Sequence, residues 1–169
     1  FKLIKEVRAK TDKPLVVMTY YNPIYCYKTG ERGFLEDLKE AGADGVILPD
    51  LPPDEADTLI PIARDLDVDT VFLVAPTSTD ERLDVVTEAC RGFIYAVSVT
   101  GVTGARTQLP TDVPSLVKRT KARSDLPVAV GFGVSGRDTA RPVAEVADGV
   151  VVGSALIRAI DNGEDVGKL

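Results

Sequence analysis

The chain has 169 residues, no histidine and two cysteines, and its 26 acidic against 20 basic side chains give a formal charge of −6. This acidic balance argues against nucleic acid and anionic membrane surfaces as partners, because both repel negative charge. Without histidine there is no Ser-His-Asp or Cys-His catalytic group and no imidazole ligand, and we expect no metal site.

No apolar stretch is long enough to span a bilayer. No secretion leader is visible, although the chain starts at Phe1 rather than Met. Cys26 and Cys90 lie far apart in the sequence, which favours a reducing, cytoplasmic compartment.

Short apolar runs recur along the chain and predict the strands of a parallel sheet. They are rich in β-branched residues and apolar on both faces, as in parallel strands that helices cover on both sides. The predicted strands are 14–19, 45–48, 70–74, 93–97, 127–130 and 149–152.

Amphipathic segments lie between the runs and predict helices. Gly42 fits the C-terminal end of one helix. Ser78, with Glu81 three residues later, fits a capping box at the start of another helix. The predicted helices are 3–9, 34–41, 55–66, 78–90, 113–123, 138–147 and 154–161.

Strands and helices alternate as six β/α units, which indicates an α/β protein with parallel strands. No linker or low-complexity tract divides residues 1–169, so we expect a single domain. Two architectures fit: an open doubly wound sheet, or part of a (β/α)₈ barrel. A complete barrel typically takes ~250 residues, so this chain would form an incomplete one.

In either architecture, ligands bind where the strands end. Gly131–Gly133 follows the fifth predicted strand, and Gly153 and Ser154 follow the last and open a helix. Glycine lets backbone amides approach an anion, and a helix N-terminus favours negative charge. With the glycines of 101–104 after the preceding strand, these turns favour a phosphate site over glycines that only form tight turns. No dinucleotide or nucleoside-triphosphate fingerprint is present.

Three further side chains near strand ends each allow two interpretations. Asp50 is a candidate acid or base, but a carboxylate that fixes its proline-rich turn is the favoured alternative. The ring of Tyr95 belongs either to the core or to a ligand pocket. Arg106 is either an anion contact or a solvated loop residue, and we favour the second.

Several segments together resemble the α subunit of tryptophan synthase, in the order and at the spacing of that family. The most specific is Gly92-Phe-Ile-Tyr-Ala-Val-Ser-Val-Thr-Gly-Val-Thr-Gly104. The other matching segments are 18–24, 42–52, 75–78, 127–133 and 147–155.

The resemblance implies a (β/α)₈ TIM barrel, of which this chain holds strands three to eight. It implies a lyase of tryptophan biosynthesis, which cleaves indole-3-glycerol phosphate to indole and glyceraldehyde 3-phosphate. No cofactor of its own is implied. The implied partner is a pyridoxal-phosphate β subunit, in an α₂β₂ complex.

The resemblance also implies roles for individual residues. The phosphate would be held by Gly104, Gly133, Gly153 and Ser154. Tyr95, Phe132, Met18 and Ile47 would line the substrate pocket, and the loop with Asp50 and Pro52 would face the β subunit. The loop after Thr103 corresponds to a lid over the substrate.

The family's catalytic Glu and Asp correspond to positions upstream of Phe1, so no catalytic residue is carried over. We therefore expect the 169 residues alone to show little or no lyase activity. Two alternatives are another phosphate-binding TIM-barrel enzyme and a non-catalytic phosphate-binding partner of a β subunit.

Overall fold

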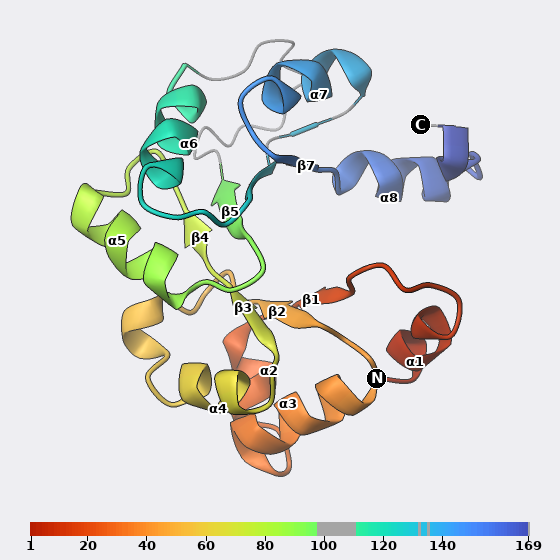
Figure 1. The fold of residues 1–169 in the computed structure, drawn as a ribbon. Coiled ribbons are helices and arrows are strands. Elements are labelled where there is room, and N and C mark those ends of the chain that lie inside the picture. The colour runs from red at the N-terminus through yellow and green to blue at the C-terminus, as the bar shows by residue number, and fades with distance from the viewer. Residues whose placement is uncertain (98–110, 132, 135, 169) are drawn as a thin grey trace. The chain divides into compact units, whose positions relative to one another are not determined.

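Parallel strands and helices alternate along the chain (Figure 1) in a computed structural model that describes residues 1–97, 111–131, 133–134 and 136–168. The strands are β1 (Val16–Met18), β2 (Gly45–Ile47), β3 (Asp69–Val71), β4 (Leu73–Val74), β5 (Ile94–Val97), β6 (Val128–Gly131) and β7 (Gly149–Val151). The helices are α1 (Lys2–Arg8), α2 (Tyr21–Tyr25), α3 (Gly30–Glu40), α4 (Leu59–Asp65), α5 (Asp80–Ala89), α6 (Val113–Lys121), α7 (Arg137–Ala144) and α8 (Ser154–Asp161), with short 3₁₀ turns at Pro53–Glu55 and Val166–Lys168.

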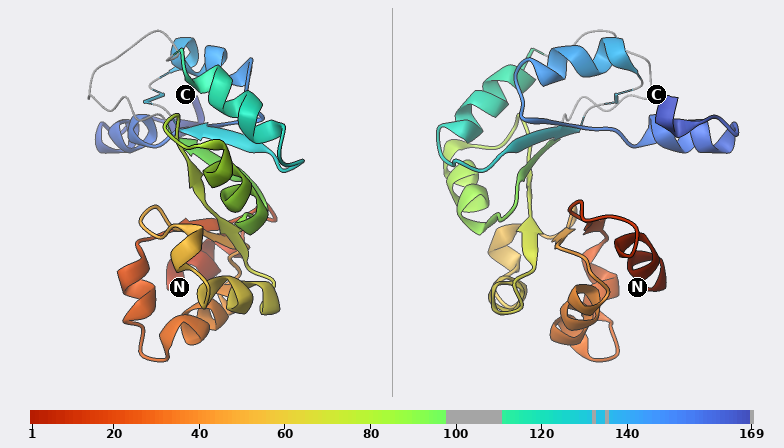
Figure 2. Two further views of the ribbon diagram at one scale, coloured as in Figure 1. Left: turned by 90° about the vertical axis from the view of Figure 1, so that its left-hand side faces the viewer. Right: turned by 45° about the vertical axis from the view of Figure 1, so that its right-hand side comes forward.

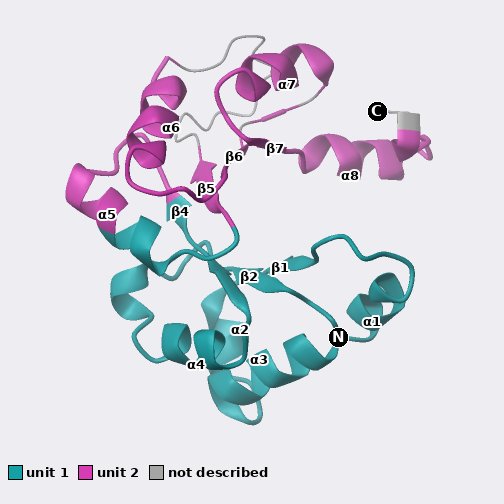
Figure 3. Ribbon diagram, in the orientation of Figure 1, with its two compact units in different colours: residues 1–73, 85–92 teal, residues 74–84, 93–169 magenta. Residues whose placement is uncertain are grey.

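The chain divides into two compact units (Figure 3). Unit 1 holds residues 1–73 and 85–92, and unit 2 holds residues 74–84 and 93–169. A parallel sheet with the order β1-β2-β3 belongs to unit 1. A second sheet has the order β4-β5-β6-β7, and its residues from Val74 onward belong to unit 2. The single domain expected over residues 1–169 remains a prediction, because such units are packing clusters rather than independently folding domains.

The core of unit 1 forms where α3 and α4 pack near the sheet. Leu35, Leu38 and Leu59 from these helices are fully buried, as is Val46 at the centre of β2. Thr70 of β3 is buried too, and its hydroxyl donates to the Ala89 carbonyl oxygen at 3.0 Å. The hydrogen bond removes the cost of burying that hydroxyl.

In unit 2, burial alternates along the strands. Ile94 and Ala96 of β5 and Val128 and Val130 of β6 are buried, whereas the residues between them are half-buried. Helices α6 and α7 lie along one side of this sheet (Figure 2), and each buries apolar side chains of its own, among them Leu116 and Val143, so we place the buried strand face on that side. The opposite face carries the side chains that could meet a ligand, since strand residues alternate between two faces.

Most predicted elements are confirmed, and the α/β class with parallel strands is confirmed with them. Gly42 does end helix α3, with a φ of +95° that suits glycine. The run 70–74 is interrupted at Phe72, whose backbone N–H donates to Cys90 Sγ at 3.3 Å instead of continuing a strand.

Three further details differ from the prediction. The helix expected from Glu55 begins at Leu59, because Pro61 has no N–H and its ring would clash with the carbonyl four residues earlier. Ser78 is not the cap of α5: the hydroxyl of Thr79 accepts the Arg82 N–H, and Ser78 Oγ accepts from Ala75 N. Helix α2 was not predicted.

Among the described residues, no helix is both long and apolar enough to cross a membrane.

Candidate phosphate-binding site

Two glycine turns follow neighbouring strands of unit 2. Strands β6 and β7 pair in parallel with Gly131 opposite Val151, so both strands end at the same edge of the sheet. Gly133 lies two residues beyond the first strand and Gly153 two residues beyond the second. The register therefore places the two turns next to each other.

Both turns leave their backbone accessible. Gly133, Gly153 and Ser154 are exposed, and Gly133 has a φ of +33°. A Cβ added at Gly133 or at Gly153 would meet no atom of the described residues within 4 Å. An anion can approach such backbone closely, because glycine itself carries no side chain.

Helix α8 adds an electrostatic contribution. Gly153 is its N-cap and Ser154 its first residue. Glycine has no side chain with which to cap the first-turn N–H groups, so these donors remain available to an external acceptor. Together with the helix dipole they favour a group such as phosphate.

Tyr95 of β5 lies on the same face as Gly131. Its ring leans diagonally across to the next strand, and a Cβ added at Gly131 would lie only 2.1 Å from the Tyr95 hydroxyl oxygen. A tyrosine hydroxyl is protonated at neutral pH, and burial raises the pKa of Tyr95 further above its ordinary value. The half-buried phenol can therefore donate a hydrogen bond from this face.

Met18 and Ile47 are register partners in β1 and β2 of unit 1. Ile47 is buried, whereas Met18 is 53% exposed. They form an apolar pair at the carboxyl end of their strands. The pocket role that the family resemblance implies for them stays a prediction.

Asp50 holds its turn to the start of helix α2. Both of its carboxylate oxygens accept the backbone N–H of Tyr21, at 2.9 and 3.1 Å. Pro52, two residues on, is half-buried. This contact supports a turn-fixing role for Asp50 over an acid–base role.

Gly104, Phe132 and Arg106 lie outside the described residues. Sequence reasoning missed the contact between Tyr95 and Gly131, which no local pattern signals. Cys26 and Cys90 are both free thiols. No three His, Cys, Asp or Glu side chains within the described ranges are grouped to hold a metal ion.

The sequence matches the family described as tryptophan synthase alpha chain over residues 1–168. The alpha chain of Deinococcus radiodurans is 52% identical over 169 residues, which are 99% of this chain and 62% of that protein. The alpha chain of Methanocaldococcus jannaschii is 46% identical over 166 residues, 98% of this chain and 58% of that protein. This chain thus spans about three fifths of the length of these relatives.

Solved structures agree with these matches. The tryptophan synthase α₂β₂ complex of Pyrococcus furiosus contains a chain with a TM-score of 0.86 and 45% identity, over 95% of this chain and 64% of that one. Mycobacterium tuberculosis tryptophan synthase gives a TM-score of 0.85 and 48% identity, over 94% of this chain and 60% of that one. Such alpha subunits are TIM barrels, which confirms the barrel class for the part of the fold that this chain holds. The chain belongs to the tryptophan synthase alpha chain family.

Proposed function

We propose that this chain serves the reaction of the tryptophan synthase alpha chain, the cleavage of indole-3-glycerol phosphate to indole and glyceraldehyde 3-phosphate. The observation that carries the proposal is the pair of exposed glycine turns after β6 and β7, in a member of this family. These turns offer backbone N–H groups and a helix N-terminus to the substrate phosphate.

The other roles follow from the chemistry of the substrate. The protonated hydroxyl of Tyr95, whose pKa burial raises further, serves as a donor within the pocket. Phe132, Met18 and Ile47 contact the apolar indole, and Gly104 joins the phosphate site. The cleavage needs an acid at the indole ring and a base at the glycerol hydroxyl. We assign neither to a residue of this chain, and we expect the 169 residues alone to bind substrate with little or no turnover.

The partner in this proposal is the pyridoxal-phosphate β subunit, in an α₂β₂ complex. A similar chain has been solved in the tryptophan synthase α₂β₂ complex of Pyrococcus furiosus. The turn with Asp50 and Pro52 would face that subunit, held in place by the Tyr21 N–H. The chain itself binds no cofactor in this proposal. Two free thiols, Cys26 and Cys90, support a cytoplasmic location.

A calorimetric titration with indole-3-glycerol phosphate tests the function, with free indole assayed in the same sample. We expect saturable binding without indole release. The variant Gly153→Asp should abolish binding, because it places a carboxylate where the phosphate would lie. The matched control Gly163→Asp adds the same charge after α8 and should leave binding unchanged.

Two results would contradict the proposal. If the folded chain does not bind indole-3-glycerol phosphate, the proposed phosphate site is wrong. Release of indole by the purified chain would show that a carboxylate within the 169 residues performs the chemistry, with Asp50 the first to test.

The partner surface has its own test, the affinity for a tryptophan synthase β subunit measured by calorimetry. Asp50→Ala releases the turn from Tyr21 and should weaken binding. Asp12→Ala removes an equal charge elsewhere on unit 1 and should not. Equal effects of both substitutions would show that net charge, rather than this loop, determines the affinity.

A further inference from the structure

Two segments of the chain share one pattern, one in each unit. Residues 8–18 (RAKTDKPLVVM) align without a gap with residues 121–131 (KARSDLPVAVG). They have Ala, Asp, Pro and Val at the same positions, and cationic and hydroxyl residues also correspond. Farther along, Ala-Asp-Gly-Val occurs at 43–46 and again at 147–150. In unit 1, the segments 8–18 and 43–46 contain β1 and the start of β2. In unit 2, the segments 121–131 and 147–150 contain β6 and the start of β7.

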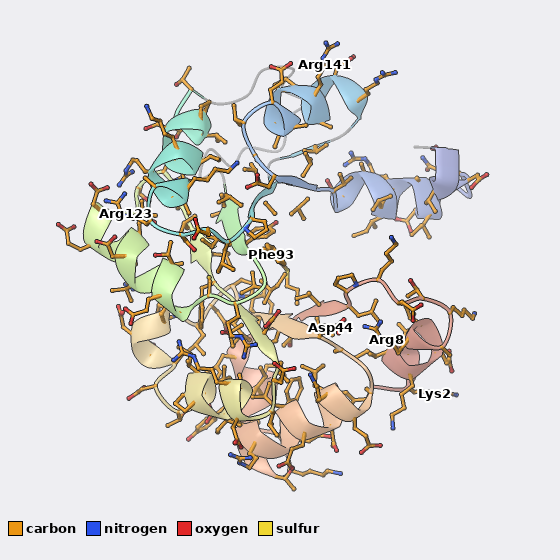
Figure 4. The ribbon with its side chains drawn as sticks, in the orientation of Figure 1. Lys2, Arg8, Asp44, Phe93, Arg123 and Arg141 are labelled. Carbon is orange, nitrogen blue, oxygen red and sulfur yellow. The ribbon has the colours of Figure 1, made fainter. Side chains whose placement is uncertain are left out.

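In unit 1 the shared arrangement centres on Asp44. Its carboxylate oxygen Oδ2 accepts the Leu15 N–H at 2.7 Å, and its own N–H donates to the Leu15 carbonyl at 2.8 Å. The Arg8 guanidinium, at the end of α1, donates to the same carboxylate (Figure 4). Asp44 thereby joins the amino ends of β1 and β2.

In unit 2 Asp148 makes the same contacts. Its Oδ2 accepts the Val128 N–H at 2.9 Å, and its N–H donates to the Val128 carbonyl at 3.0 Å. Lys121, the last residue of α6, donates to Oδ1 at 2.8 Å. Asp148 therefore joins the amino ends of β6 and β7.

The two arrangements differ in what lies at the other end of the strands. Strands β6 and β7 end in the glycine turns of the candidate phosphate site, whereas β1 and β2 end in Met18 and Ile47. Strand β7 spans only Gly149–Val151, so Asp148 lies five residues before Gly153. An extended chain is nearly inextensible, so a shift at Asp148 moves Gly153 relative to Gly133.

We propose that Asp148 is a positioning residue for phosphate binding, because it fixes the register of β7 against β6 and thereby the separation of the two glycine turns. This inference rests on the proposed function. It goes further by assigning a binding effect to a side chain that lies at the opposite end of the strands from the ligand. Asp44 makes equivalent contacts in unit 1 and does not hold these turns, so it provides the matched control.

The experiment compares the full 169-residue chain with Asp148→Ala and Asp44→Ala. Affinity for inorganic phosphate is measured by calorimetry, at a temperature at which circular dichroism shows each variant folded. We expect Asp148→Ala to weaken phosphate binding on the order of tenfold or more, and Asp44→Ala to change it less than twofold. Both variants should lower the unfolding midpoint in urea.

Backbone amide spectra supply a readout that a loss of stability alone would not change. In the wild-type chain, phosphate should shift the amide signals of Gly133, Gly153 and Ser154. In Asp148→Ala without ligand, the chemical shifts of these amides should already differ from those of the wild-type chain. In Asp44→Ala they should equal the wild-type values. If Asp148→Ala does not fold, Asp148→Asn, which keeps an acceptor for the Val128 N–H, should weaken binding by a smaller factor.

Each outcome separates the two proposals. If the wild-type chain binds no phosphate, the proposed function fails and this inference fails with it. If the wild type binds and the folded Asp148 variants bind equally well, only the positioning role is overturned. Equal losses in the Asp148 and Asp44 variants would also overturn it, since they would reflect general destabilisation.

Discussion

At the scale of single residues, Tyr95 and Gly131 restrict each other. A methyl group at position 131 would lie 2.1 Å from the Tyr95 hydroxyl oxygen and 2.6 Å from Cζ, far inside contact distance. Gly131→Ala should therefore force the phenol aside and cost about 1–3 kcal/mol of unfolding free energy, as overpacking usually does. Urea unfolding of the variant measures this cost.

A double-mutant cycle separates this clash from other effects of the methyl group. With Tyr95→Leu as the background, the cost of Gly131→Ala should fall by more than half, because the ring that it displaces is gone. Tyr95→Phe should not relieve the strain, since Cζ remains. Additive costs in the Leu background would show that the two residues do not restrict each other.

The ion pairs of Asp80 make the stability of the folded chain depend on pH. The Arg119 guanidinium donates to its Oδ1 at 2.6 and 2.9 Å, and Arg123 lies 3.1 Å from Oδ2. The hydrogen bond from Arg119, supported by the nearby Arg123 charge, holds the pKa of this carboxyl below its usual range. A lowered folded-state pKa gives stability that is present above the unfolded pKa of about 3.9 and is lost as the pH falls through the folded value.

We therefore expect the urea midpoint to fall below pH 4, and Asp80→Asn to reduce the slope of that fall. The comparison is with Asp12→Asn, an exposed carboxylate for which the structure shows no ion pair among the described residues. Identical slopes for wild type and Asp80→Asn between pH 4 and pH 2 would contradict the prediction. The effect should be small, since the pair is exposed and screened by solvent.

At the scale of helices and strands, the sequence predicted most positions because each depends on local patterning. The apolar runs located the strands, and Gly42 marked a helix end through its backbone freedom. The predicted elements were wrong where the local structure depends on a residue far away in the sequence. The interruption at Phe72 depends on Cys90 Sγ, which lies 18 residues away in the sequence. Ser78 and Thr79 are both suitable caps, and only the structure shows which hydroxyl the Arg82 N–H reaches.

Helices α6 and α8 are both amphipathic, but the structure buries them differently. Leu116 of α6 is 1% exposed, whereas Ile157 and Ile160 of α8 are 61% and 63% exposed. Leu116→Ala should cost about 2–5 kcal/mol, because it leaves a cavity in a packed core. Ile157→Ala should change the stability by less than about 0.5 kcal/mol.

Chemical unfolding of the two variants checks this difference. Ile160→Ala serves as a second exposed substitution on the same helix. A cost for Ile157→Ala comparable with that of Leu116→Ala would mean that the apolar face of α8 is buried in solution.

At the scale of the whole molecule, the sequence indicated the fold class and the family, but not the long-range contacts that fix strand register. The separate Ala-Asp-Gly-Val segments gave no sign that each aspartate binds the amide of the preceding strand, because the partners Leu15 and Val128 lie 29 and 20 residues away. Among the site residues, Gly133, Gly153 and Ser154 were found by their place after strands, whereas Met18 and Ile47 followed only from the family resemblance. Their binding roles remain predictions.

Phosphate binding should protect unit 2 more than unit 1. A ligand that binds only the folded state stabilises it by about 2.7 kcal/mol at a concentration one hundred times the dissociation constant. The proposed contacts at Gly133, Gly153 and Ser154 all belong to unit 2. Amide exchange that proceeds through local opening of this unit should therefore slow in the presence of phosphate.

Hydrogen exchange at Val130 in unit 2 and Val46 in unit 1 measures the difference, since both side chains are fully buried in central strands. Exchange at Val130 should slow by up to about a hundredfold at that ligand concentration, while exchange at Val46 changes much less. Equal slowing at both amides would mean that the two units open only together. No slowing at either, with binding seen by calorimetry, would mean that phosphate binds at a place other than these turns.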